Sequence, residues 1–420
     1  MKDLLKPRSV LVVLGSGGVG KTTIAAALGV AAARTHMRTA VITVDPARRL
    51  RQALGLPRLS GKPTRIDVRR LRAAALDPAL KLSAMVLDVK GAWDAMVAEH
   101  VADPVLRRRI LDNPFYQSLS TRFAGSDAYA ALEALHDLHT AGRFDLEVVD
   151  TPPAAHALEF VQAPARLMRL LDSQAARWLV GPGGRPASLA LRLAGRITGY
   201  VARELERFAG GQTLSAIADF FAAASGAVEG ISARMLKVSA LLRSPAVHFV
   251  LVTTAEADRL HQAERLIERM QAEGLQLDAV VINRFLDESI FRGFDRALDE
   301  IPALAAALRP DGAGDSGIAA ALEYLESYRA RAEQNLHRVK RFVHGLPPQM
   351  RIALAPELRP GAPGLAALGR LADFLVTPQA SVGRPGRRTN APRGEADARR
   401  SAAAAASQKT QSRETRRMPE

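Results

Sequence analysis

The chain has 420 residues, of which 48% are apolar and 24% charged, so it can bury a large core and suits a helix-rich α/β protein. It contains no cysteine, which excludes disulfides, thiolate catalysis and cysteine-based zinc or soft-metal sites, and which agrees with a cytoplasmic location. The net charge of +15 admits a polyanionic partner.

The first predicted element is a short apolar strand, Ser9-Val-Leu-Val-Val-Leu14. The residues before it lack the basic, apolar and small-residue order of a signal peptide, so we expect a protein that is not exported by that route. A nearly continuous apolar run of this length is typical of a parallel strand that is covered on both faces. An Ala/Leu-rich stretch at 22–34 predicts a helix shortly afterwards.

A phosphate-binding loop joins this strand to this helix and reads Gly-Ser-Gly-Gly-Val-Gly-Lys-Thr-Thr. Its glycines permit positive φ, so that consecutive N–H groups can converge on an anion. Lys21 supplies charge to the β- and γ-phosphates, and the Thr22 hydroxyl suits Mg²⁺. The candidate nucleotide-binding residues are therefore Gly15, Ser16, Gly17, Gly18, Val19, Gly20, Lys21, Thr22 and Thr23, with Lys21 also a catalytic candidate.

Further apolar runs predict strands at 39–44, 146–149, 247–253, 279–282 and 351–354. Helical patterns separate most of these runs, so the predicted fold class is α/β. We expect a doubly wound, mostly parallel sheet of the P-loop NTPase type, with its ligand at the carboxyl ends of the strands.

Two long stretches, about 71–139 and 158–243, interrupt the alternation and look helical. We expect them to meet as an α-helical subdomain within an ATPase domain that spans residues 1–375, with a turn at Gly181–Pro186 inside the second stretch. Residues 376–420 are poor in large apolar side chains, and 381–420 carry ten Lys/Arg against four Asp/Glu. This composition predicts a basic, disordered tail, for which a solubilising role is favoured over binding of a polyanion.

Two aspartates stand where predicted strands end. Asp150 follows the run at 146–149 and opens Asp-Thr-Pro-Pro, so it is the candidate for holding Mg²⁺ together with Thr22. Asp45 ends the second strand and is a candidate for activating water. Each also has a purely structural alternative, because Asp before Thr or Pro is a common turn former and helix cap.

These motifs together resemble the ArsA-like ATPases, which include the arsenite-pump ATPase and the ATPase that targets tail-anchored membrane proteins. The loop at 17–23 is similar to the family's deviant Walker A motif, 45–50 to its first switch and 150–158 to its second switch. The runs at 263–267 and 280–284 are similar to its adenine-side segment, which implies that Asn283 contacts the base. The resemblance implies ATP and Mg²⁺ as ligands, and a dimer.

The sequence departs from that family in three ways. The deviant loop of the family carries a second lysine that reaches the phosphates of the partner subunit, and this chain has Ser16 there. Cysteine-based binding of arsenite or of an intersubunit zinc is excluded. The groove expected for a transmembrane helix is poor in methionine, with only Met85, Met96, Met168 and Met235 in the two insertions.

We therefore expect a cytoplasmic, Mg²⁺-dependent ATPase whose nucleotide state switches the conformation of its subunits and helical subdomain. The expected partner is a second copy or a related subunit, with a membrane protein as a further possible partner; nucleic acid is not expected. One alternative is a nucleotide-dependent scaffold, or a partner-activated switch, with little intrinsic hydrolysis. Another is a partitioning or positioning ATPase that acts on DNA or membrane through the tail.

Overall fold

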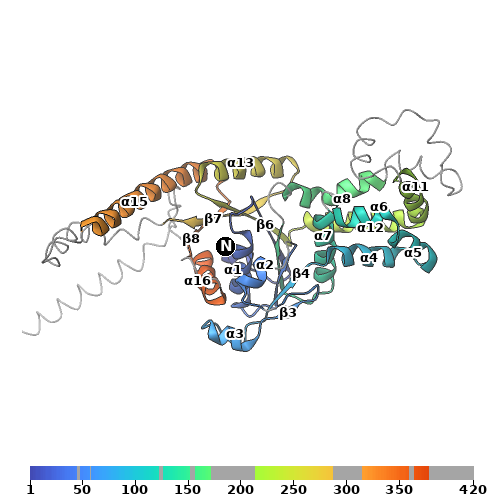
Figure 1. The fold of residues 1–420 in the computed structure, drawn as a ribbon, viewed down its shortest axis with the longest axis horizontal. Coiled ribbons are helices and arrows are strands. Elements are labelled where there is room, and N and C mark those ends of the chain that lie inside the picture. The colour runs from blue at the N-terminus through green and yellow to red at the C-terminus, as the bar shows by residue number, and fades with distance from the viewer. Residues whose placement is uncertain are drawn as a thin grey trace, which may run out of the picture. The chain divides into compact units, whose positions relative to one another are not determined.

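An eight-stranded sheet forms the centre of the protein, in the order β3-β4-β2-β5-β1-β6-β7-β8 (Figure 1). The computed structural model describes residues 1–44, 48–56, 58–122, 126–151, 157–171, 213–286, 315–358 and 364–377. The strands are β1 (Ser9–Gly15), β2 (Thr39–Thr43), β3 (Thr64–Arg65), β4 (Leu82–Val86), β5 (Leu146–Asp150), β6 (Val247–Thr254), β7 (Leu277–Phe285) and β8 (Arg351–Pro356). Asp45, the turn at Gly181–Pro186 and nearly all of the tail lie outside the described residues.

The doubly wound, mostly parallel sheet is confirmed. Every neighbouring pair of strands is parallel except β3 and β4. All six predicted strands are present. β1 and β5 are buried along their whole length, as expected for strands with helices on both faces. The phosphate-binding loop therefore leaves the sheet from a central strand.

The expectation that 71–139 is wholly helical was wrong, because β4 lies within it. β4 pairs with β2 from Thr39↔Leu82 to Thr43↔Val86, so it is an integral strand of the sheet. Its sequence, Leu-Ser-Ala-Met-Val, contains residues that also favour helices, and its place in the sheet depends on pairing with a distant segment. Apart from the last residues of α3 (Val68–Ala73), the helices of the first insertion come after this strand.

Helices cover both faces of the sheet (Figure 1). On one side α1 (Lys21–Ala33) packs between the sheet and α16 (Leu365–Val376). Arg34 joins the two helices by donating to the Gly369 carbonyl at 3.1 Å. The other side carries α13 (Ala257–Ala272) and α15 (Asp315–His344). Because α1 is buried nearly all round, its first turn is held rigidly against the end of β1.

The remaining helices either lie near the sheet, against helices that cover it, or form a group beside it. Of the helices near the sheet, α2 (Arg48–Ala53) packs on α1 and α3 (Val68–Ala73) contacts α16. The group consists of α4 (Val89–His100), α5 (Pro104–Leu111), α6 (Pro114–Arg122), α7 (Ser126–Thr140), α8 (Ala157–Leu171), α11 (Thr213–Ala224) and α12 (Val228–Leu242). None of the described helices combines the length and apolarity needed to cross a membrane.

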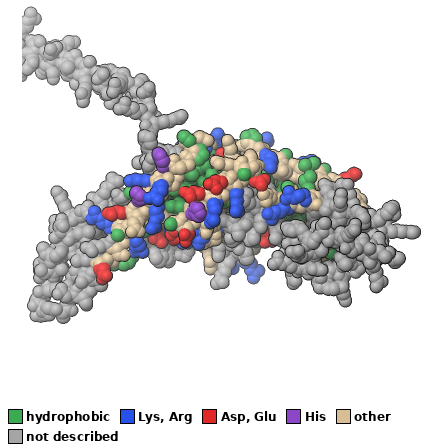
Figure 2. All heavy atoms as spheres, turned by 90° about the horizontal axis from the view of Figure 1, so that it is seen from above, with side chains coloured by type: hydrophobic (Ala, Val, Ile, Leu, Met, Phe, Trp, Pro, Cys, Tyr) green, Lys and Arg blue, Asp and Glu red, His purple; other side chains and the backbone are tan. Residues whose placement is uncertain are grey.

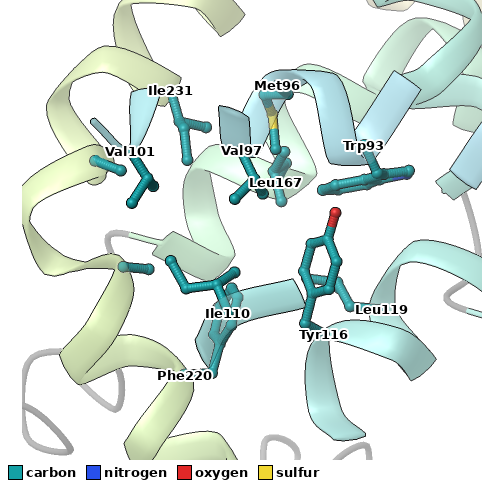
Figure 3. A pocket seen from close by; sticks show the side chains of 12 residues that line it. Trp93, Met96, Val97, Val101, Ile110, Tyr116, Leu119, Leu167, Phe220 and Ile231 are labelled. Atoms are coloured by element: carbon teal, nitrogen blue, oxygen red, sulfur yellow. The ribbon is translucent and has the colours of Figure 1, made fainter. Parts of the chain in front are cut away.

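The helical group has an apolar core of its own, shown in Figure 3. Trp93 of α4, Tyr116 of α6, Phe220 of α11 and Ile231 of α12 point toward one another around a cavity of about 20 Å³. Met96 also lines this cavity, and Met235 is fully buried. A cavity of this size holds about one water molecule, so these helices pack tightly on one another in this structure.

Candidate functional site

The backbone of the phosphate-binding loop takes conformations that require glycine. Gly15, Gly18 and Gly20 have φ of 152°, 81° and 91°. A Cβ atom on Gly15 would lie 2.3 Å from the Val252 carbonyl oxygen, and one on Gly20 would lie 2.3 Å from Nδ2 of Asn283. A Cβ atom on Gly18 would meet nothing within 4 Å. The loop is thus tightly packed at its ends and has open space beside Gly18, where a ligand could approach the backbone.

Lys21 begins α1 and folds back over this loop. Its Nζ donates to the carbonyl oxygens of Gly15 at 3.0 Å and Ser16 at 3.2 Å. The side chain is 8% exposed, so the ammonium group is held at the loop and not in bulk solvent. The N-terminus of α1 adds the positive end of the helix dipole. Together they create a strongly anion-attracting pocket.

Asp150 lies at the carboxyl end of β5, between the ends of β1 and β2. Its Oδ2 accepts hydrogen bonds from the Thr22 hydroxyl at 2.7 Å and from the Thr43 hydroxyl at 3.0 Å. Asp150 is 1% exposed. A carboxylate and a hydroxyl oxygen in contact are hard donors of the kind that Mg²⁺ prefers, so the chemistry of these two groups fits that ion.

Asn283 reaches the loop from β7, 264 residues away in sequence from its partner. Its Nδ2 donates to the Val19 carbonyl at 2.8 Å, and the side chain is buried. The pairing of β7 with β8 is irregular between Ile282 and Phe285, and Arg284 has a φ of 54°, a strained value for a residue with a side chain. The structure thus places Asn283 against the loop itself.

Ser16 stands where the resembling family has its second lysine. It is 9% exposed, and its Oγ has no hydrogen-bond partner among the described residues. In the described ranges no Lys or Arg side chain donates to this Oγ, although Lys21 donates to the Ser16 carbonyl. The site therefore holds one loop lysine, Lys21.

A cleft of about 430 Å³ opens at the same edge of the sheet. Its wall includes Thr254 at the end of β6, Glu256 just before α13, Arg284 near the end of β7, and Glu357, which follows β8. One face of α15 contributes Arg331 and Arg338. Thr254 is the register partner of Asn283, so the cleft adjoins the loop. Its volume lies within the range of small-molecule sites.

The structure therefore brings Lys21, Thr22, Asp150 and Asn283 together at one end of the sheet. Asp45, residues 152–156 of the second expected switch, and the first residues of the first switch lie outside the described ranges. Thr43 was not predicted as a site residue, because the sequence shows there only a hydroxyl near the end of a predicted strand. The arginines of α15 were not predicted either, because they become neighbours of the site only through the fold.

Comparisons with known proteins show which proteins this chain is similar to. A family model described as anion-transporting ATPase matches residues 8–296. The chain is 24% identical over 274 residues to ATPase GET3 of Malassezia globosa, which covers 65% of this chain and 71% of that protein. It is 27% identical over 293 residues to ATPase get3 of Schizosaccharomyces pombe, covering 68% and 77%. An uncharacterized protein of Streptomyces coelicolor is 37% identical over 194 residues, 45% of this chain and 44% of its own length.

Proposed function

Because the chain belongs to the anion-transporting (ArsA) ATPase family and is a nucleotide-binding P-loop ATPase, we propose that it hydrolyses ATP with Mg²⁺ at the site described above. The observation that carries this proposal is the contact of Thr22 with Asp150, which joins the phosphate-binding loop to the end of β5. It supports a single centre in which Lys21 and the loop amides bind phosphate while Thr22 and Asp150 hold the metal.

Each residue of this centre has a role that follows from its chemistry. Bound Mg²⁺ would neutralise charge on the β- and γ-phosphates. The Lys21 ammonium leaves the carbonyls of Gly15 and Ser16 and pairs with phosphate oxygens. Asn283 fixes the loop from the nucleoside side and orients the base toward the adjoining cleft. We assign Asp45 the task of orienting the attacking water.

Loss of the γ-phosphate would release the segments 45–50 and 150–158, as in other nucleotide switches. The segment at 150–158 leads from Asp150 into α8, a helix of the group beside the sheet. We infer that the nucleotide state is passed along this route to a helical subdomain, within an ATPase domain of residues 1–375. A dimer partner, and a membrane protein bound by the helices, complete the proposal, which we place in the cytoplasm.

The serine at position 16 supports a second candidate function, in which a partner subunit is needed for hydrolysis. Ser16 leaves the site without a lysine that acts on the phosphates of a partner. A nucleotide-dependent scaffold or partner-activated switch, with slow hydrolysis by the isolated chain, would have this composition. A partitioning role on DNA or membrane through the basic tail is the third candidate function.

The test is phosphate release by the purified chain with ATP, with and without Mg²⁺, compared with two variants. Lys21→Ala removes the ammonium held at the loop, and should lose both ATP affinity and turnover. Lys237→Ala removes an exposed lysine of α12 and should behave as the unaltered chain. Full affinity and turnover in Lys21→Ala would overturn the assignment. Nucleotide binding without turnover in the unaltered chain would favour the scaffold.

A further inference from the structure

More than half of the net positive charge of the chain comes from one short stretch. Residues 48–90 contain eleven Lys/Arg and three Asp, a net +8 out of +15. This stretch contributes β3 and β4 at one edge of the sheet, and the helices α2 and α3, which contact α1 and α16. Figure 1 shows β3 and α3 at the bottom of the drawing, away from α13 and α15 at the top. Positive charge is therefore concentrated in this part of the molecule.

None of the three aspartates in this stretch neutralises a neighbouring cation through an ion pair of the described residues. Asp67 accepts from the Arg69 amide at 2.6 Å, Asp77 from the Ala79 amide at 2.8 Å, and Asp88 from the Gly91 amide at 2.9 Å. Two of these bonds cap α3 and α4. The carboxylates are thus engaged in holding the backbone.

Five exposed cations follow one another in sequence from the segment before β3 to α3, and we name them the basic strip: Arg58, Lys62, Arg65, Arg69 and Arg72. Within the described ranges none of the five forms an ion pair. Arg69 and Arg72 are three residues apart on α3, so they share a face of that helix.

The backbone beneath the strip is well anchored. Leu71 of α3 is fully buried, as are Ile66 just before the helix and Leu54 just after α2. Arg70 donates to the Gly55 carbonyl and so ties α3 to the end of α2. The strip is therefore a fixed surface on a packed base, and its charges cannot move apart freely.

The face that carries α13 and α15 has a different charge pattern. Figure 2 views the molecule from that side and shows Lys and Arg side chains interspersed with Asp and Glu. Among these residues Arg259 pairs with Glu256, and Arg329 with Glu333. Mixed charge is the ordinary condition of a solvated surface, so the basic strip stands out from it.

We propose that the basic strip docks this protein on an anionic lipid bilayer. This goes beyond the proposed ATPase activity, and it uses a surface other than the tail. The side chain of Val68, between the strip residues of β3 and α3, is 41% exposed, and the interface of a bilayer would bury it. Each cation near an anionic leaflet raises the partition coefficient roughly fivefold.

A bilayer fits the strip better than a nucleic acid does. Residues 48–90 contain no Phe, Tyr or Trp, so the strip has no ring on which unpaired bases could stack. α3 has six residues, which is short for a helix that reads a groove, and its exposed apolar side chain would face phosphates and water there. The anionic headgroups of a bilayer pair with the guanidinium groups, and the boundary between headgroups and acyl chains buries the valine.

The experiment is flotation of the full chain with vesicles of phosphatidylcholine and phosphatidylglycerol at 3:1, and with phosphatidylcholine alone, at about 0.15 M salt. The strip variant is Arg65→Gln/Arg69→Gln/Arg72→Gln. The matched control, Arg265→Gln/Arg269→Gln/Lys340→Gln, removes the same charge from exposed positions on α13 and α15. We expect the unaltered chain and the control to bind anionic vesicles only, and the strip variant to bind about 100-fold more weakly, because three cations are lost.

Equal losses in both variants would overturn the proposal, because they would reflect net charge alone. It is also overturned if the unaltered chain does not float, or if the strip variant loses binding to duplex DNA but not to vesicles. ATP hydrolysis should be the same in all three proteins, which separates this result from failure of the ATPase assignment. If the strip variant does not fold, Arg58→Gln/Lys62→Gln, outside any helix, should still weaken vesicle binding about 25-fold.

Discussion

At the scale of single residues, one side-chain amide joins two distant parts of the active centre. Asn283 holds the Val19 carbonyl, and its Nδ2 occupies the space that a side chain on Gly20 would need. The geometry of the phosphate-binding loop therefore depends on β7 as well as on its own glycines. This coupling means that a loop substitution should affect stability and ligand binding together.

We expect Gly20→Ala to reduce ATP affinity and to lower the free energy of unfolding by about 1–3 kcal/mol, because the new methyl group meets Asn283 and φ stays positive. Gly226→Ala is the control, since its Cβ meets nothing within 4 Å and its φ is not positive. Urea unfolding and titration calorimetry measure the two effects. Normal values of both for Gly20→Ala would contradict the packing described here.

A second prediction concerns the carboxylate at the end of β5. Asp150→Asn keeps the shape of the side chain and removes its charge, so it should raise the Mg²⁺ concentration needed for half-maximal phosphate release by about 10–100-fold. Thr43→Val, which removes one hydrogen bond to the same carboxylate, should have a smaller effect. An unchanged Mg²⁺ titration in Asp150→Asn would show that the metal is held elsewhere.

Much of this residue-level site could be predicted from sequence, because a loop, a hydroxyl and a carboxylate at strand ends converge in any parallel sheet. Lys21 and Thr22 needed only the local motif. The hydrogen bond between Thr43 and Asp150 could not be predicted, since it depends on β2 lying directly beside β5. The positive φ of Arg284 had no signal, because nothing in its sequence requires a turn there.

At the scale of elements, β5 carries a buried acid in the middle of the sheet. Glu147 is fully buried, and its Oε2 lies 3.2 Å from Nδ1 of His139 on α7. Burial raises the pKa of Glu147 above its ordinary value, while the contact with His139 acts in the opposite direction and is the weaker effect. The folded protein thus holds the Glu147 proton more tightly than the unfolded chain does.

Because the folded protein binds this proton more tightly, its stability depends on pH. The stabilisation linked to protonated Glu147 is fully present below the unfolded pKa of about 4.3 and is lost as pH rises through the folded value. Glu147→Gln cannot lose a proton, so its stability relative to the unaltered chain should increase as the pH rises through the range between the unfolded and the folded pKa of Glu147. Denaturant unfolding at several pH values measures this, and the same comparison in a His139→Gln background removes the contribution of the imidazole. A constant difference across that range would refute it.

The elements themselves were predictable to different degrees. Strands with uninterrupted Val and Leu, such as β1, were evident from their composition. β3 has two residues and is defined only by its pairing with β4, so no local pattern could indicate it. β4 was missed for a related reason, because Ala and Met in a short run do not distinguish strand from helix.

At the scale of the whole molecule, the single loop lysine implies help from a second subunit. A cation supplied in trans to transferring phosphates is worth about 10³-fold or more in rate. A chain carrying both Ser16→Lys and Lys21→Ala cannot hydrolyse ATP itself but offers the missing lysine. Added to the unaltered chain, it should raise phosphate release by roughly that factor.

The control for this mixture is Lys21→Ala alone, which lacks the added lysine and should give no increase. Sedimentation of each mixture with ATP and Mg²⁺ shows whether the two chains associate. If they associate and the rate stays low, the lysine does not act across the interface. If they stay apart, a related subunit and not a second copy is the partner.

The order of strands in the sheet also has a consequence for folding during synthesis on the ribosome. β1 is made first, yet its neighbours are β5 and β6, whose residues pair with it from Leu146 and Val247 onward. Asn283 is made later still. During synthesis β1 is therefore unpaired until β5 has been made and lacks its second neighbour until β6 has been made, so apolar backbone and side chains are exposed to aggregation over that interval. The contact between Asn283 and the phosphate-binding loop forms only after β7 has been made, so a translation product that ends before β7 lacks it.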